Sequence, residues 1–195
     1  MKTPNLLVSG NLKLDKSIYT FSIPPIITCP NHSQCSTNCY AVKCYEAYDQ
    51  AKTIWDRNYE LSKDTYNFSR SITSEIKRRK IKTVRIHVSG DYYNRTYLES
   101  WRLIAYYNPK TFFYGYSRCF DIMNLENFNN FHNVNIVNSI LPDGYSNFGT
   151  APYIARKSWE LDIPICPVTA KRKWARCGDT CTMCHTHSHM LFVKH

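Results

Sequence analysis

The chain has 195 residues, a length typical of one domain, and a formal net charge of +10 with a pI near 9.2. No stretch approaches eighteen consecutive apolar residues and the N-terminus has no signal-like apolar run, so we expect a soluble, cytoplasmic protein without a membrane span. The positive charge favours an anionic partner, with nucleic acid as one possibility.

In chain order, the first predicted strand covers residues 17–27 and ends at a pair of prolines. Aromatic and aliphatic side chains at helical spacing predict one broken helix, or two, over 44–80. A β-branched run predicts a buried strand at 83–90, and residues 94–107 form a helical stripe with Asn94 as its N-cap.

The same alternation continues to residue 166. The remaining predicted elements are a strand at 111–117, a short helix around 122–128, a strand at 134–140, a helix near 152–160 and a fifth strand at 161–166. Strands alternating with helices indicate βαβ units and a parallel sheet. We therefore expect an α/β fold, either a small partial (βα) barrel or an open parallel sheet.

Cysteines gather near both ends of the chain, which contains nine of them. The first group, Cys29, Cys35 and Cys39, lies in a loop (29–44) after the first strand, and Cys44 follows it. The second group comprises Cys166, Cys177, Cys181 and Cys184. Disulfides seldom persist in cytoplasm, so we interpret both groups as metal ligands.

The two groups differ in the metals that they fit. Three thiolates in the first loop suit a 4Fe-4S cluster with one open iron. The second group could hold a complete 4Fe-4S cluster or Zn²⁺, and the imidazoles of His185, His187 and His189 keep zinc open. We expect an α/β domain over 1–166 and a metal-stabilised Cys/His-rich tail over 167–195, packed on that domain.

Ligands of parallel sheets collect at the carboxyl ends of the strands. The first cysteine group follows strand one, and Ser89, Gly90 and Asp91 follow strand two. Arg118 follows strand three, and Cys166 ends the fifth predicted strand. We therefore expect these residues to share one site. Asp91 and Arg118 are the candidate catalytic residues, because a carboxylate can receive a cation and a guanidinium can hold a carboxylate or phosphate.

Several runs of the sequence resemble the phage and plasmid family called gene product 88. They are TCPNHSQCSTNCYA (28–41), RIHVSGDYY (85–93), FYGYSR (113–118) and the cysteines of the C-terminal group. The resemblance covers most of the chain and implies a protein of a phage or mobile element. It carries no established activity.

A second similarity is to radical S-adenosylmethionine enzymes. In those partial βα barrels, three cysteines after strand one hold a 4Fe-4S cluster, and a turn after strand two meets the cofactor. By this resemblance Cys29, Cys35 and Cys39 would be cluster ligands, and Ser89, Gly90 and Asp91 would face S-adenosylmethionine. The usual C-x3-C-x2-C spacing is absent from the first loop and occurs instead at 177–184.

Three classes of function are consistent with these features. The first is an iron–sulfur protein of radical-enzyme type that modifies a nucleic acid or protein. The second is a non-catalytic iron–sulfur or zinc protein that binds nucleic acid, supported by the net charge and by the basic runs at 77–80 and 171–176. The third is a structural zinc protein that acts through protein contacts. The sequence leaves open whether the protein is an enzyme.

Overall fold

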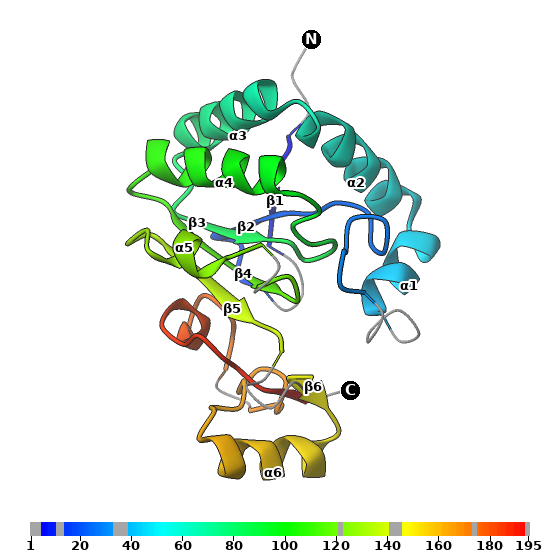
Figure 1. Ribbon diagram of the computed structural model, residues 1–195, viewed down its shortest axis with the longest axis vertical. Coiled ribbons are helices and arrows are strands. Elements are labelled where there is room, and N and C mark those ends of the chain that lie inside the picture. Colours follow the sequence, from blue (N-terminus) through cyan, green and yellow to red (C-terminus); the bar gives the residue numbers. More distant parts are fainter. Residues whose placement is uncertain are drawn as a thin grey trace.

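A computed structural model describes residues 5–10, 14–32, 39–120, 123–140, 146–172 and 175–193. A five-stranded sheet with the order β1-β2-β3-β4-β5 lies at its centre (Figure 1). The strands are β1 (Val8–Ser9), β2 (Ile18–Phe21), β3 (Thr83–Ile86), β4 (Phe112–Ser117) and β5 (Val134–Asn138). Strands β2 to β5 pair in parallel, whereas β1 pairs antiparallel with β2. The predicted α/β class is confirmed, with a mostly parallel open sheet.

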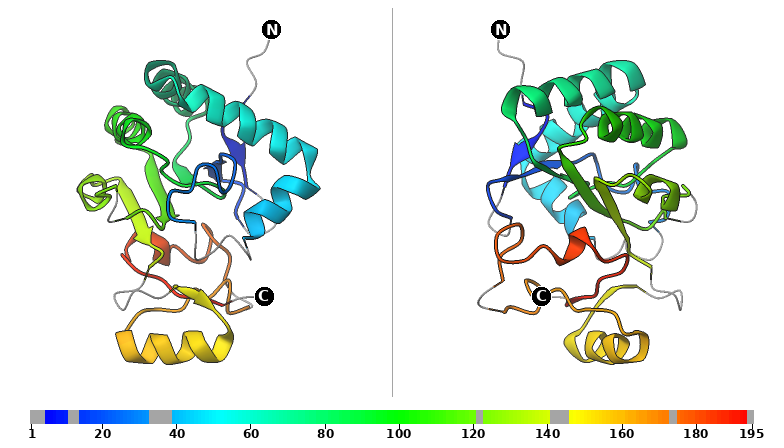
Figure 2. Two further views of the ribbon diagram at one scale, coloured as in Figure 1. Left: turned by 45° about the vertical axis from the view of Figure 1, so that its right-hand side comes forward. Right: turned by 90° about the vertical axis from the view of Figure 1, so that its left-hand side faces the viewer.

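Helices connect the parallel strands, and three of them (α3, α4 and α5) lie over one face of the sheet (Figures 1 and 2). The helices up to β5 are α1 (Tyr40–Ala47), α2 (Asp49–Ser62), α3 (Thr65–Arg79), α4 (Arg95–Tyr107) and α5 (Glu126–Asn129). The prediction of one or two helices over 44–80 was wrong, because three occupy this region. The backbone is extended at Tyr48 and Asp64, and an extended residue interrupts the helical hydrogen bonds.

The boundaries of α4 follow from its capping residue. The side chain of Asn94 accepts a hydrogen bond from the backbone N–H of Tyr97 across 2.8 Å, which confirms the predicted N-cap. Similarly, Asp64 caps α3 by accepting from the backbone N–H of Asn67 across 3.0 Å. Local capping chemistry therefore sets the start of both helices.

The main hydrophobic core lies between the sheet and these helices. Phe21 of β2 packs with Phe68 of α3 and Trp101 of α4, with ring centroids 5.3 Å and 5.4 Å away. All three side chains are fully buried. Val84 and Ile86 of β3 face this core, so Arg85, between them, projects toward the opposite face.

The C-terminal part of the chain covers that opposite face (Figure 2). Its elements are β6 (Phe148–Gly149), α6 (Ala151–Leu161), the 3-10 helix η2 (Met183–His185) and β7 (Phe192–Val193), and β6 pairs in parallel with β7. Asn135 of β5 attaches η2 to the sheet, since its side-chain amide donates to the carbonyl of Cys184 across 2.7 Å.

The predicted fifth strand at 161–166 is absent from this described segment. Helix α6 extends to Leu161, and Ile165 forms only an isolated bridge with Leu191. Pro164 has no N–H to donate to a strand partner, and only its carbonyl bonds, accepting from the N–H of Leu191. The fifth strand of the central sheet is instead the short antiparallel β1.

Candidate functional site

A cavity of about 180 Å³ opens at the carboxyl edge of the parallel strands. It is lined by residues from the segments that follow β2, β3, β4 and β5, together with Arg85 and Tyr116 from within strands: Pro25, Cys29, Asn31, Cys39, Tyr40, Ala41, Arg85, His87, Val88, Ser89, Gly90, Asp91, Tyr116, Arg118 and Ser139. Of the predicted site residues, the structure thus brings Cys29, Cys39, Ser89, Gly90, Asp91 and Arg118 together. Cys35 lies outside the described residues.

The carboxylate of Asp91 is buried and already hydrogen-bonded by the protein. Its Oδ1 accepts from the hydroxyl of Ser117 across 2.7 Å and from its neighbouring backbone N–H at Tyr92 across 2.8 Å. Its Oδ2 accepts from the backbone N–H of Arg118 across 2.9 Å. Burial raises the pKa of Asp91, and these hydrogen bonds oppose that rise. Asp91 therefore joins the turn after β3 to the end of β4.

Gly90 allows this turn to pack tightly against the first cysteine loop. Its φ is +82°, and an added Cβ would lie 2.3 Å from Cγ1 of Ile23 and 2.7 Å from Oγ1 of Thr28. Two backbone hydrogen bonds flank the contact, from Ile23 N–H to the Ser89 carbonyl and from Asp91 N–H to the Thr28 carbonyl. Only glycine has both the backbone freedom and the small size that this position needs.

Arg85 is the residue of the cavity that the sequence analysis missed. Its Nε is buried and has no hydrogen-bond partner among the described atoms. Its guanidinium carbon lies 4.9 Å from the ring centroid of Tyr116, within cation–π range. A charged residue between the apolar residues Val84 and Ile86 of a buried strand was the signal available in the sequence.

Ser89 and Arg118 complete the polar lining. The hydroxyl of Ser89 is buried without a hydrogen-bond partner among the described atoms. In contrast, Arg118 donates from Nη2 to the hydroxyl of Ser146 across 2.9 Å, and its carbonyl accepts from the side-chain amide of Asn31 across 3.0 Å. Arg118 thus links the first cysteine loop to the segment that follows β5.

Two further thiols lie close to this site. Cys119 is fully buried, and burial raises its pKa, with the nearby charges of Asp91 and Cys29 acting in the same direction. Cys44 lies in α1 and is half-buried. Neither thiol lines the cavity.

The second cysteine group packs against the other face of the sheet and does not line the cavity. Cys166, Cys177 and Cys184 belong to one buried cluster with Ile18 and Tyr114. Cys166 was expected at the carboxyl edge beside Asp91; it lies instead in the tail, where its N–H donates to the Leu191 carbonyl. Since its segment forms no strand of the central sheet, it does not end at that edge.

The four tail thiols are close enough to influence one another. The backbones of Cys177 and Cys181 form an isolated β-bridge. The charges of Cys166 and Cys181 raise the pKa of the Cys177 thiol. The pKa of Cys184 is raised to about 12, mainly by burial, and the charges of Cys166 and Cys177 act in the same direction. Arg85 opposes the rise in the pKa of Cys177 and of Cys184. Arg85 therefore acts on two of the tail thiols and also lines the cavity with Cys29 and Cys39.

Hydroxyl groups from β4 face these thiols. The phenol of Tyr116 donates to Sγ of Cys184 across 2.8 Å, and the phenol of Tyr114 lies 3.8 Å from Sγ of Cys177. Within the described ranges, no three His, Cys, Asp or Glu side chains are arranged to hold one metal ion. The metal-ligand assignments accordingly stay predictions.

The tail histidines have other neighbours. The ring of His185 packs on Phe112 and Tyr114, with centroids 4.5 Å and 5.0 Å away, and burial lowers its pKa. Nδ1 of His187 lies 2.8 Å from the carbonyl of Met183. These contacts account for the two side chains without a metal.

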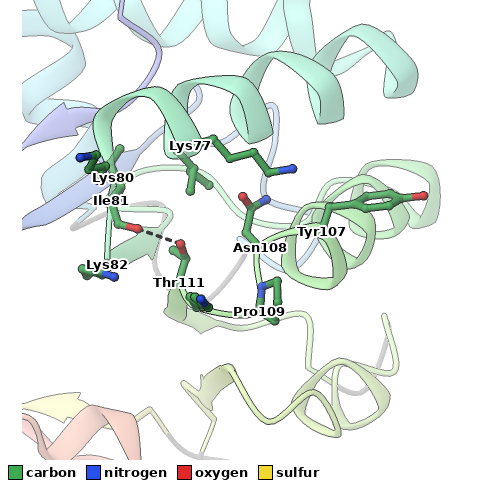
Figure 3. Close-up of a pocket in the computed structure, with 10 residues that line it drawn as sticks. Lys77, Lys80, Ile81, Lys82, Tyr107, Asn108, Pro109 and Thr111 are labelled. Atoms are coloured by element: carbon green, nitrogen blue, oxygen red, sulfur yellow. Dashed lines mark hydrogen bonds between the residues drawn. The ribbon is translucent and has the colours of Figure 1, made fainter.

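A separate basic pocket of about 340 Å³ lies at the opposite, amino edge of the sheet (Figure 3). Lys77, Lys80, Lys82 and Lys110 line it and are exposed. Tyr107, which is 57% exposed, lines it as well. Within the pocket, the hydroxyl of Thr111 donates a hydrogen bond to the Ile81 carbonyl across 2.8 Å. Only part of this basic surface comes from the predicted basic run at 77–80.

Among the helices that the structure describes, none is long and apolar enough to cross a membrane. Neither curated proteins nor solved structures give a match to the chain. The family model described as gene product 88 matches residues 4–154. The match contains the first cysteine loop, the Ser89–Asp91 turn and Arg118, and it ends before the second cysteine group. Because the model covers more than half of the sequence, the chain belongs to the gene product 88 family.

Proposed function

We propose that this protein binds iron–sulfur clusters, with Cys166, Cys177, Cys181 and Cys184 as the ligands of one 4Fe-4S cluster. The observation that supports this proposal most directly is that Cys166, Cys177 and Cys184 pack in one cluster with Tyr114 and Tyr116 on one face of the sheet, and Cys181 lies close enough to Cys177 to raise its pKa. Four cysteine thiolates are the usual ligand set of such a cluster. A bound cluster would supply one-electron transfer and would stabilise the tail.

The side chains around the tail thiols are suited to a negatively charged cluster. The Tyr116 hydroxyl would donate to a ligand sulfur, a contact that tunes clusters in general. Arg85 would offset part of the charge of the thiolates. Because burial raises the pKa of Cys177 and Cys184, the metal has to displace protons from both thiols.

The first cysteine group is proposed as the site of a second cluster, held by Cys29, Cys35 and Cys39. The lining of the cavity by Cys29 and Cys39 supports it. In the radical-enzyme form of this proposal, S-adenosylmethionine would bind the open iron and its amino group would meet Asp91. That carboxylate already accepts three hydrogen bonds, so the structure supports cluster binding better than it supports cofactor cleavage.

Metal analysis of anaerobically purified protein tests the proposal. We expect brown protein with an absorbance near ~400 nm and about four irons and four sulfides per cluster. Cys177→Ser combined with Cys184→Ser should remove the irons of the tail cluster, whereas Cys44→Ser should remove none. A colourless preparation that contains only zinc would refute iron–sulfur binding and favour the structural zinc protein. Addition of S-adenosylmethionine to the reduced protein should alter its electron paramagnetic resonance spectrum only in the radical-enzyme form.

Nucleic-acid binding is a second candidate function, favoured by the basic pocket. Its four lysines make no ion pair with any carboxylate of the described residues, so their charge is available to phosphates. The exposed ring of Tyr107 could stack on a base. This function does not depend on the identity of the metal.

Salt-dependent binding to duplex DNA and to single-stranded RNA tests this second function. Lys80→Gln with Lys82→Gln should reduce the magnitude of the slope of log affinity against log salt by about 1–2. The matched control is Lys52→Gln with Lys63→Gln, since these lysines pair with Asp56 and Glu60. Equal effects of the two double variants would exclude the pocket as the binding site.

A further inference from the structure

We propose that the cavity at the carboxyl edge is a binding site for a small oxyanion, a carboxylate or phosphate group, held by Arg85, Ser89 and Arg118. This inference does not require a bound cluster, although the proposed ligands Cys29 and Cys39 line the same cavity and Arg85 also lies near the tail thiols. The three side chains line the same cavity of about 180 Å³.

Two unused hydrogen-bonding groups point to a ligand. The Nε of Arg85 and the hydroxyl of Ser89 are both buried and without a hydrogen-bond partner among the described atoms. Ser89 is only 3% exposed. Buried polar groups of native proteins nearly always have partners, and leaving one unmade is costly. A ligand that accepts from both groups would remove this cost.

The charge of Arg85 indicates that the ligand is an anion. No carboxylate of the described residues forms an ion pair with Arg85. Its titratable neighbours are phenols and tail thiols, namely Tyr40, Tyr114, Tyr116, Cys177 and Cys184. Arg85 is half-buried with its Nε shielded from water, and its guanidinium stays protonated at any ordinary pH, so a negative charge beside it would compensate the desolvation.

The other groups of the cavity are compatible with an anion. Asp91 lines the same space, but both of its oxygens accept hydrogen bonds from Ser117 and from the backbone, so they do not face an incoming ligand unbonded. Arg118 adds a second positive charge to the lining. The planar fork of a guanidinium matches carboxylate and phosphate groups in particular.

The position of the cavity agrees with this assignment. Small ligands of parallel α/β sheets bind at the carboxyl ends of the strands, and Arg85, Ser89 and Arg118 come from β3 and from the segments that follow β3 and β4. The volume admits a small ligand and excludes a folded macromolecule. We therefore assign the site to a metabolite-sized anion.

Thermal unfolding of the full chain as purified tests the site, with inorganic phosphate and acetate as probes and chloride as the reference at equal ionic strength. At ten times the dissociation constant, phosphate or acetate should raise the melting temperature by about 3 °C more than chloride does. Arg85→Met should raise the dissociation constant of the anion about tenfold or more. The probe that binds more tightly identifies the oxyanion as carboxylate or phosphate.

Three further variants keep the test decisive if Arg85→Met does not fold. Ser89→Ala and Arg118→Met should each reduce the anion-dependent shift. Arg102→Met, which removes an arginine paired with Glu99 on α4, should leave it unchanged. The proposal fails if neither anion stabilises the protein more than chloride, or if Ser89→Ala and Arg118→Met retain the full shift. Both outcomes concern anion binding alone and are distinguished from a failure of cluster binding by the iron and sulfide content of the same preparation.

Discussion

The hydroxyl of Tyr116 in the central strand β4 donates a hydrogen bond to Sγ of Cys184 in the C-terminal tail, across 2.8 Å. This contact connects two residues that are 68 positions apart. It places a hydrogen-bond donor against one of the proposed cluster ligands, so its removal should be visible in the properties of the cluster.

Tyr116→Phe should make the reduction potential of the tail cluster more negative. In the wild-type protein, the hydrogen bond from Tyr116 would stabilise the reduced cluster, which carries more negative charge. If the bond contributes about 1 kcal/mol, its loss shifts the potential by an amount on the order of 40 mV for one electron. Electron paramagnetic resonance during a redox titration measures this shift. Tyr114→Phe is the matched control, because its hydroxyl lies 3.8 Å from Sγ of Cys177. Equal shifts in the two variants would contradict the assignment.

Asp91→Asn should destabilise the protein by about 2–4 kcal/mol. The new amide group would direct a donor toward the Ser117 hydroxyl or the Arg118 N–H, both of which donate to the carboxylate in the native protein. Ser117→Ala, which removes only one of these donors, should cost about 1 kcal/mol. Urea unfolding compares the variants. If Asp91→Asn lowers the free energy of unfolding by less than Ser117→Ala does, Asp91 does not join the turn after β3 to the end of β4.

Gly90→Ala should be destabilising by about 2 kcal/mol or more, because the added methyl group overlaps Ile23 and requires a positive φ. Ser89→Ala is a suitable control in the same turn. The Ser89 hydroxyl has no partner among the described atoms, so its loss should change the free energy of unfolding little. Chemical denaturation measures both effects. Similar stability of Gly90→Ala and wild type would contradict the tight contact between the turn and the first cysteine loop.

His87 should make the protein sensitive to acid. Burial lowers the pKa of His87 from 6.5 to about 3, and its Nε2 lies 2.8 Å from the Tyr97 hydroxyl. The folded protein keeps the imidazole neutral, whereas the unfolded chain binds a proton below pH 6.5. The contribution to stability is therefore complete above pH 6.5 and is lost as the pH falls toward 3, with a loss of about 2 kcal/mol by pH 5.

His87→Asn separates this effect from the titration of other groups. Asparagine tolerates the positive φ of 60° at this position and does not titrate. Urea unfolding at pH 7 and pH 5 should show a smaller loss of stability in the variant than in wild type. The same loss in both proteins would mean that His87 does not contribute to acid sensitivity.

The sequence by itself predicted several local elements and the parallel sheet of βαβ units. The β-branched run that contains Arg85, and Asn94 at its helix start, predicted β3 and α4 because side-chain alternation and N-capping are local properties. The rule that parallel strands end at one edge also placed Ser89, Asp91 and Arg118 near one another, and the structure has them around one cavity.

Only the tertiary structure decided which groups lie against the face of the sheet opposite α3, α4 and α5. Cys184 meets Tyr116, and Cys166 is separated from the cavity, because the tail folds back over the sheet through long-range contacts. Long-range packing also decided the antiparallel pairing of β1 and left the Nε of Arg85 without a partner among the described atoms. Pairing between distant segments depends on the packing of the whole chain, which no local pattern of residues encodes.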